Sequence, residues 1–301
     1  MRHILSALPR PGANTLGILF MILAVFCFTA MDAQVKGMVD RYPAPMLVWI
    51  RFVGQLVLVI LLLRGKFFTH MRTRFPVTHV ARAATQIGAT AMFFTSLSYI
   101  GLAEATALMD VNPVLITLGA ALFLGEKLGP RRLFGVFAAL FGALIVIRPG
   151  AGLFSPAALL PMLGAISYAA NALITRWIGQ KESAWTAMVF TSVICTALAS
   201  LPLPFVWVPV ATSDLPTFVL VAILGTTAQL CLIRGFTLAE ASSVAPFAYL
   251  GILFATFWGI VLFDTYPDKW TVIGALVIVV AGLYVWHRET RAQRNDNRTA
   301  Q

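Results

Sequence analysis

Five charged residues stand inside or at the edge of long apolar runs, where a charge is unusual. They are Asp32, Arg51, Asp110, Glu104 and Glu240. If these runs cross a lipid bilayer, ionisable groups inside them bind a charged substrate, carry protons or pair with each other. Asp32 and Arg51 fall at similar depth in neighbouring runs, so a structural ion pair is the alternative to a role in binding or proton coupling. We expect Asp110 to face a central cavity.

Two prolines interrupt apolar runs at similar places in the two halves of the chain. Pro113 and Pro246 each remove a backbone donor and displace the carbonyl group four residues earlier. Inside a membrane, such a carbonyl must find another partner or line a cavity. The prolines are therefore expected to form packed kinks or hinges. Asn112 lies beside Pro113 and Tyr249 follows Pro246, so both are candidates for hydrogen bonds to a ligand.

Uncharged polar and aromatic side chains complete the candidate site. Gln86, Asn171 and Gln229 lie in apolar runs. Hydrogen bonding between helices is the ordinary role of such residues, and substrate contact is the alternative. Tyr168 is one of many aromatic residues in these runs, most of which must pack or face lipid. A planar substrate ring could stack on a few of them.

The composition restricts the scaffold that positions these residues. The chain has 301 residues, of which 59% are hydrophobic and 11% are charged. Because soluble domains carry roughly 25% charged residues, a soluble enzyme is excluded, and so is a disordered chain. The three cysteines all lie in apolar runs without a CxxC motif, which argues against a disulfide framework. The composition predicts an all-α polytopic membrane protein.

Uncharged runs bounded by charge, proline or glycine predict ten transmembrane helices. They cover residues 15–35, 45–63, 83–100, 103–124, 133–147, 157–175, 185–206, 216–233, 241–263 and 270–286. With the N-terminus inside, 17 of the 22 Lys and Arg residues fall on the inner side and four on the outer side, as the positive-inside rule requires. The net charge of +10 then reflects membrane topology, and no nucleic-acid partner is expected. Both termini, including a basic tail at residues 288–301, are expected on the cytoplasmic side of the plasma membrane, which is the inner membrane in a bacterium.

The two halves of the chain resemble each other. Residues 102–106 read LAEAT and residues 238–242 read LAEAS, and each segment is followed by a proline and later by a pair of glycines. Residues 15–147 and 157–287 are therefore predicted to be two five-helix repeats. Because five is odd, the second repeat enters the membrane with inverted orientation, an arrangement typical of alternating-access transporters. Chance similarity between apolar helices is the alternative.

The same segments resemble the drug/metabolite transporter superfamily, EamA type. Tyr99–Pro113, Phe123–Gly142 and Ser242–Gly282 carry the resemblance, which extends over about residues 16–287. The last of these segments is similar to a subgroup that includes riboflavin and S-adenosylmethionine carriers. The resemblance implies ten helices in two inverted repeats, cytoplasmic termini and a central cavity lined by both halves. It does not identify the substrate.

Together these features favour a secondary transporter of a small organic metabolite that works by alternating access in the lipid bilayer. Riboflavin uptake is the first expectation, because riboflavin is neutral and aromatic; S-adenosylmethionine uptake and amino-acid or drug efflux are the alternatives. A membrane-embedded lipid-modifying enzyme is disfavoured, because no histidine joins the few intramembrane acids. No phosphate-binding loop GxxxxGK(S/T) and no HExxH motif is present, so no metal and no cofactor are expected. The oligomeric state and the coupling ion stay open.

Overall fold

The computed structural model describes residues 13–112, 114–116, 118–119, 130–147, 156–179, 181–238 and 245–299. This part of the chain is helical and contains no strand, which confirms the all-α prediction for these residues. Its α-helices are α1 (Ala13–Lys36), α2 (Ala44–Leu63), α3 (Pro76–Ser96), α4 (Leu102–Met109), α6 (Pro130–Ile147), α7 (Leu159–Gly179), α8 (Ala184–Ser200), α9 (Leu203–Val206), α10 (Leu215–Leu238), α12 (Leu250–Phe263) and α13 (Lys269–Thr299). The short 3-10 helices η4 (Thr212–Asp214) and η5 (Ala245–Tyr249) precede α10 and α12.

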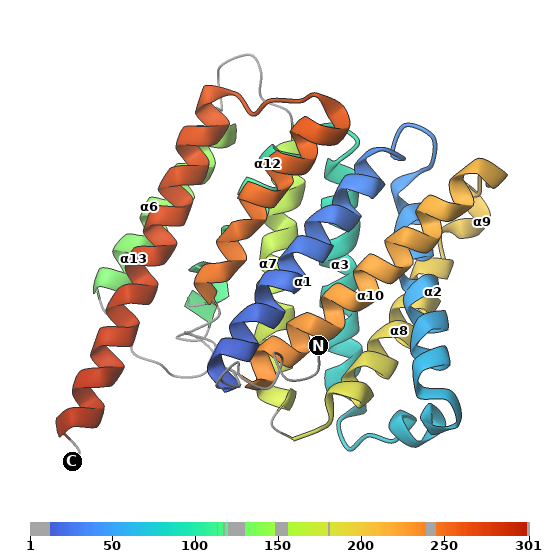
Figure 1. The fold of residues 1–301 in the computed structure, drawn as a ribbon, viewed down its shortest axis with the longest axis horizontal. Helices are drawn as coiled ribbons and strands as arrows, with labels where there is room; N and C mark the ends of the chain where they lie inside the picture. Colours follow the sequence, from blue (N-terminus) through green and yellow to red (C-terminus); the bar gives the residue numbers. More distant parts are fainter. Residues whose placement is uncertain are drawn as a thin grey trace, which may run out of the picture.

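Helices from the two halves of the chain are interleaved in the bundle. α1 packs along α10, α3 along α7, and α6 along α13, so each of these close pairs takes one helix from either half. Figure 1 shows α6 and α13 at one side of the bundle and α2 and α8 toward the other. Glycines permit the α6–α13 contact, since a Cβ on Gly274 would lie 2.6 Å from the carbonyl oxygen of Gly142. Helices from both halves of the chain therefore enclose the interior of the bundle.

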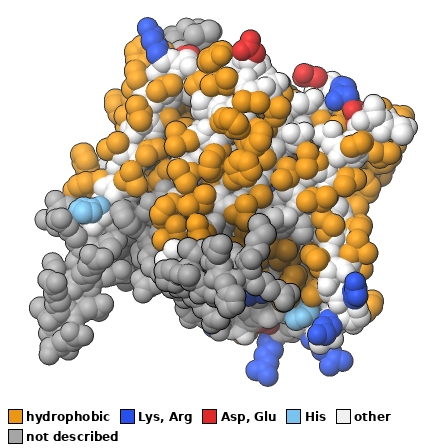
Figure 2. Space-filling view, viewed as in Figure 1, with side chains coloured by type: hydrophobic (Ala, Val, Ile, Leu, Met, Phe, Trp, Pro, Cys, Tyr) orange, Lys and Arg blue, Asp and Glu red, His pale blue; other side chains and the backbone are white. Residues whose placement is uncertain are grey.

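The surface of the bundle suits a bilayer. Apolar side chains cover its middle, and charged side chains lie at its two ends (Figure 2). Within the described residues, four helical segments are long and apolar enough to cross a membrane, namely Thr15–Lys36, Ala44–Lys66, Pro156–Thr175 and Thr212–Gly235. Three shorter apolar helices accompany them, so the number ten remains a prediction. We call the end with the α1–α2 and α12–α13 connections the outer end, following the predicted orientation, and the opposite end the inner end.

The structure differs from several of the predicted span boundaries, and three of these differences concern the third, the seventh and the last span. The third helix begins at Pro76 rather than near residue 83, because proline suits the first helical position. Arg82, which was expected to flank this span, lies inside α3 and is only 1% exposed. The seventh span is divided, since α8 ends at Ser200 just before Pro202, which has no N–H group to continue the helix. The last helix continues to Thr299, through most of the predicted tail.

Candidate functional site

The fourth apolar run is an interrupted helix, and Asp110 lies at the interruption. α4 ends at Met109, and Asp110 follows with φ −72° and ψ 5°. Helical hydrogen bonding starts again at Val111, whose carbonyl accepts from the backbone N–H of Val114 at 3.1 Å. The side-chain amide of Asn112 donates to the carbonyl of Met109 at 2.9 Å. Asn112 therefore satisfies the carbonyl that Pro113 was expected to displace, while Pro113 itself lies outside the described residues.

The carboxylate of Asp110 is buried without a full set of partners. The residue is 7% exposed, and its Oδ2 atom has no hydrogen-bond partner in the described part of the chain. Gly251 of α12 lies against it, because a Cβ there would be 3.5 Å from Oδ2 and 3.7 Å from Cγ2 of Thr106. The Thr106 hydroxyl is likewise buried and unpartnered among these residues. Buried polar atoms of this kind are costly, and they are expected where a ligand completes the bonding.

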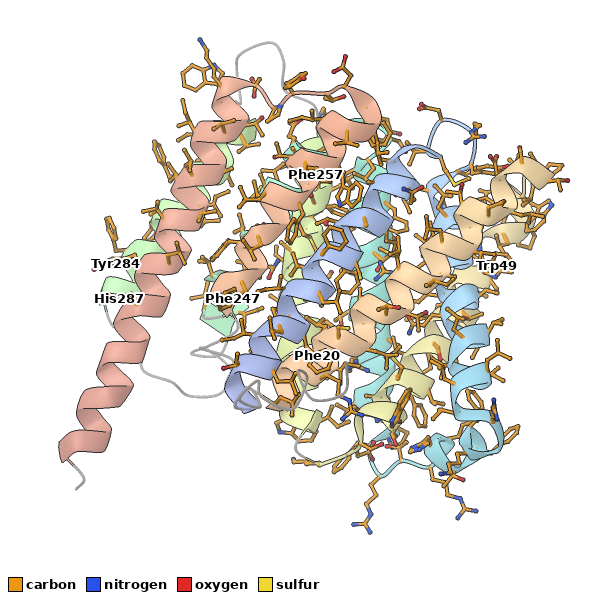
Figure 3. All side chains as sticks on the ribbon, in the orientation of Figure 1. Phe20, Trp49, Phe247, Phe257, Tyr284 and His287 are labelled. Carbon is orange, nitrogen blue, oxygen red and sulfur yellow. The ribbon has the colours of Figure 1, made fainter. Side chains whose placement is uncertain are left out.

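Two tyrosines lie near Asp110, one from each of two further elements. Tyr249 ends η5, directly before α12, and is 6% exposed. Its hydroxyl reaches Gly282 of α13 and has no hydrogen-bond partner in the described part. Figure 3 labels Phe247, two residues earlier, at the inner end of α12. Tyr168 of α7 lies within electrostatic range of both Asp110 and Arg51.

Arg51 of α2 is buried among aromatic rings rather than paired with an acid. Its guanidinium donates to Oγ1 of Thr90 at 3.1 Å, and its Nε atom has no partner among the described residues. The guanidinium carbon lies 5.4–5.7 Å from the centroids of three rings, those of Phe28, Phe52 and Phe94, which is within the range of cation–π attraction. Asp32 acts electrostatically on Arg51. No direct ion pair between Asp32 and Arg51 is formed in the structure described.

The three uncharged polar candidates lie in the interior with different partners. The amide of Asn171 in α7 donates to the carbonyl of Arg82 at 2.7 Å, which is a helix–helix contact with α3. Gln86 of α3 and Gln229 of α10 are 6% and 5% exposed, and neither bonds another described side chain. The structure thus places Asn171 in a helix–helix contact and buries Gln86 and Gln229 in the interior.

A cavity of about 420 Å³ lies at the outer end, between the two halves of the chain. Its walls come from the end of α1, the α3–α4 connection, the start of α4, the end of α12 and the α12–α13 connection. Lys36 lines it and donates to the carbonyls of Leu97 and Ile100 at 2.6 and 3.0 Å. Asp32 is one helical turn below Lys36, and Asp110 follows Glu104 of the wall by six residues, or about 9 Å of helix. The described residues that line the cavity do not include Asp110, Asp32, Arg51 or Tyr249.

Sequence reasoning missed three residues that shape this site. Thr90 and Thr106 carry hydroxyl groups beside Arg51 and Asp110, and Gly251 allows α12 to approach the Asp110 carboxylate. Threonine and glycine are frequent in membrane helices, so nothing in the sequence distinguishes these from their neighbours. Only their position next to a buried charge does so.

Comparison with known proteins decides the family. The sequence pattern of the EamA-like transporter family matches residues 15–148 and again residues 155–286. The chain belongs to the EamA-like transporter family. The resemblance expected from the sequence is thereby confirmed, and membership points to a membrane transporter rather than to an enzyme.

Curated relatives of this EamA-like transporter carry names of different substrates. A riboflavin transporter of Rhizobium johnstonii is 28% identical over 288 residues, 95% of either chain. The pseudopaline exporter CntI of Pseudomonas aeruginosa is 28% identical over 271 residues, 88% of this chain and 94% of its own. An S-adenosylmethionine uptake transporter of Rickettsia bellii is 25% identical over 281 residues, 92% of this chain and 96% of its own. A crystal structure of a protein 19% identical in sequence covers 93% of this chain with a TM-score of 0.66, which supports the fold.

Proposed function

We propose that this chain is a secondary transporter that moves a small organic metabolite by alternating access, with its binding site around Asp110. The observation that carries the proposal is the buried, incompletely bonded carboxylate at a broken helix. Broken helices with polar groups at membrane depth are the usual form of a transporter binding site. Asp110 and Arg51 come from the first half of the chain and Tyr168 and Tyr249 from the second, so the proposed site draws on both halves, as alternating access requires.

The proposed topology is two inverted five-helix repeats, residues 15–147 and 157–287, in the plasma membrane, with both termini cytoplasmic. The interleaved helix pairs α1–α10, α3–α7 and α6–α13 support this arrangement, because in each pair a helix of one repeat packs against a helix of the other. The excess of Lys and Arg on the proposed inner side supports the orientation. Residues 288–301 form the basic cytoplasmic tail in this proposal.

Riboflavin is the substrate that we propose to test first, in the direction of uptake. The riboflavin transporter of Rhizobium johnstonii aligns over 95% of this chain. Three aromatic rings surround Arg51, and two of them, Phe52 and Phe94, are buried at 1% and 0% exposure, so stacking of a flat, neutral ring system on them requires the site to open.

A second substrate class is favoured by a different observation. Asp110 Oδ2 and Arg51 Nε are buried groups of opposite charge, and both lack partners in the described residues. S-adenosylmethionine carries a carboxylate and cationic groups, so it would satisfy both. An S-adenosylmethionine uptake transporter is among the relatives. Because an exporter is also among them, efflux of an amino acid or a drug is the alternative in direction.

The experiment is uptake of labelled riboflavin and, separately, of labelled S-adenosylmethionine into proteoliposomes, with and without an imposed proton gradient. Movement of riboflavin without movement of S-adenosylmethionine supports the flavin proposal, and it assigns the charged groups Asp110 and Arg51 to coupling or to structure. Movement of S-adenosylmethionine alone makes Asp110 and Arg51 the first substitutions to test. If neither compound moves, both substrate proposals are wrong, and a screen for metabolite export from loaded vesicles replaces them.

A further inference from the structure

The connection between α2 and α3, at the inner end of the bundle, carries a dense group of cations. It spans residues 64–75 and contains no Asp or Glu, whereas four of its residues are cationic, namely Arg64, Lys66, Arg72 and Arg74. All four are exposed. Two short 3-10 helices, η1 (Arg64–Lys66) and η2 (Phe68–Met71), form its first part. Figure 2 shows Lys and Arg side chains gathered at this end of the bundle.

One aromatic residue anchors the connection, and the next one points away from the bundle. Phe67 is 7% exposed and belongs to a buried apolar cluster with Val59 of α2 and Met188 of α8. Phe68 is 77% exposed, and Met71 is also exposed. Because Phe68 and Met71 are three residues apart in a 3-10 helix, they lie on one face of η2. The connection therefore presents an apolar face to its surroundings, close in sequence to its cations.

A carboxylate of the second half of the chain fixes the other end of the connection. Glu182, between α7 and α8, accepts from the hydroxyl of Thr73 at 2.6 Å and from the backbone N–H of Arg74 at 2.9 Å. Its other oxygen lies 2.7 Å from Nε2 of His79. In the described part of the chain, no ion pair joins Glu182 to any of the four cationic side chains. Their charge is therefore available to a partner outside the protein.

Exposed apolar residues flank the connection on both sides. Leu61 and Leu62 at the end of α2 are exposed, and so is Val77 at the start of α3. Exposed apolar surface of this kind marks contact with a membrane or with another protein. A short segment that combines Lys and Arg with an exposed phenylalanine is typical of the boundary between hydrocarbon and headgroups. The surroundings of the connection thus favour lipid as its partner.

The backbone of Arg64 is strained. Its φ is 48° and its ψ is −126°, which are the angles of the first central residue in a type II′ turn, where glycine is preferred. The glycine of this segment stands at the next position, Gly65. Strained residues of this kind gather at sites that bind a ligand or carry out another function. An exposed cation in this conformation therefore points to a role beyond folding.

We propose that the α2–α3 connection is a binding surface for anionic phospholipids of the inner leaflet. The four cationic side chains contact the headgroup phosphates, and Phe68 and Met71 enter the adjoining acyl chains. Membrane topology alone requires an excess of cations on this side, but it does not require a fixed segment with exposed apolar side chains beside them. The surface rests on the membrane orientation that forms part of the proposed function.

The test measures which lipids gather at the connection. In the full-length protein the three cysteines are replaced by serine, and Thr69→Cys, an exposed position in η2, carries a fluorophore. The vesicles contain phosphatidylcholine and phosphatidylglycerol in equal parts, and one lipid or the other carries a quenching spin label on its acyl chain near the headgroup. Tyr266→Cys, exposed in the α12–α13 connection at the outer end, is the control position for the fluorophore.

We expect labelled phosphatidylglycerol to quench at position 69 at least about threefold more strongly than labelled phosphatidylcholine, since each Lys or Arg near an anionic surface strengthens attraction about fivefold. At position 266 the two lipids should quench equally. Replacing Arg72 and Arg74 together by glutamine should remove at least half of the preference. Lys269→Gln, which removes an exposed cation of the outer end, should leave the preference unchanged.

Two results would overturn the proposal. Equal quenching by the two lipids at position 69 would assign the cations to topology or to an acidic protein partner. A preference that survives both the double substitution and high salt would not be electrostatic, because salt screens exposed charges.

Arg64→Gly separates lipid binding from folding. Glycine adopts the observed φ without strain, so this variant should raise the melting temperature in lipid-free detergent while it lowers the preference for phosphatidylglycerol. A lower melting temperature or an unchanged preference excludes Arg64 from the surface and contradicts its part in the proposal. No substrate enters these measurements, so transport can fail in the counterflow assay while the lipid preference stands, and the preference can fail while counterflow proceeds.

Discussion

Replacing Asp110 by asparagine should make the protein more stable and a much poorer transporter. The substitution keeps the size and shape of the side chain and removes its charge. In the folded protein Asp110 is 7% exposed, and its Oδ2 atom lacks a partner in the described residues. A buried charge without full bonding opposes folding, so its removal should stabilise the empty transporter.

The expected sizes follow from the local bonding. An unsatisfied buried polar atom costs about 1–3 kcal/mol. Since the amide still has to be buried, we expect a gain near the lower value. A change of about 1 kcal/mol corresponds to ~2–4 °C in chains of 150–250 residues. Because Asp110 is proposed to bind the substrate and a hydrogen bond to a charged group contributes about 1.5–3 kcal/mol, the transport rate should fall by roughly 10- to 100-fold.

Two assays on the same purified protein check this prediction. Thermal unfolding in detergent gives the melting temperature, and counterflow in proteoliposomes at several pH values gives the rate. Asp40→Asn is the matched control, because Asp40 is exposed on the α1–α2 connection and should change neither quantity. An Asp110→Asn variant with unchanged rate and unchanged pH dependence would refute a transport role for Asp110. A lower melting temperature would show that the carboxylate is a structural group.

Three further outcomes follow from single contacts. Arg51→Lys should reduce counterflow at least about tenfold. A compact ammonium group keeps the charge but loses the planar face that lies over three rings and the bond to Thr90. Equal counterflow rates for the variant and the parent protein would exclude a role for the guanidinium shape. Gly274→Ala should cost about 1–3 kcal/mol in thermal unfolding, since its Cβ would lie 2.6 Å from a backbone oxygen of α6, whereas Gly65→Ala, with nothing within 4 Å, should change little. Burial raises the pKa of Glu182. Hydrogen bonds from neighbouring side chains and from a backbone N–H together outweigh this effect, so the pKa lies below its usual value of 4.5. The contribution of the ionised carboxylate to stability is then present above pH 4.5 and is lost as the pH falls through the lowered pKa. Glu182→Gln should therefore reduce the melting temperature at neutral pH and have no effect in strong acid. A constant difference between the two proteins across the pH range would contradict this.

The sequence alone was sufficient for the class of protein and for the main charged residues. Apolar runs determine where helices form, because unpaired backbone groups are not tolerated in lipid. An ionisable residue in such a run is conspicuous for the same reason, which is how Asp32, Arg51 and Asp110 could be singled out. The two copies of the family pattern correspond to a repeat that was visible in the matching of residues 102–106 and 238–242.

The tertiary structure decided which partners surround each of these residues and which contacts join the two halves. Arg82 looked like a charge flanking a helix, yet it is buried because hydroxyl and carbonyl groups of α7 and α8 surround it. An ion pair between Asp32 and Arg51 was one alternative from the sequence, but aromatic rings and Thr90 lie beside the guanidinium instead. Asp214 and Glu182 lie in connections, where carboxylates are ordinary, and only folding brings donors from more than a hundred residues away to them. Such contacts depend on the approach of distant segments, and no local pattern in the sequence records that approach.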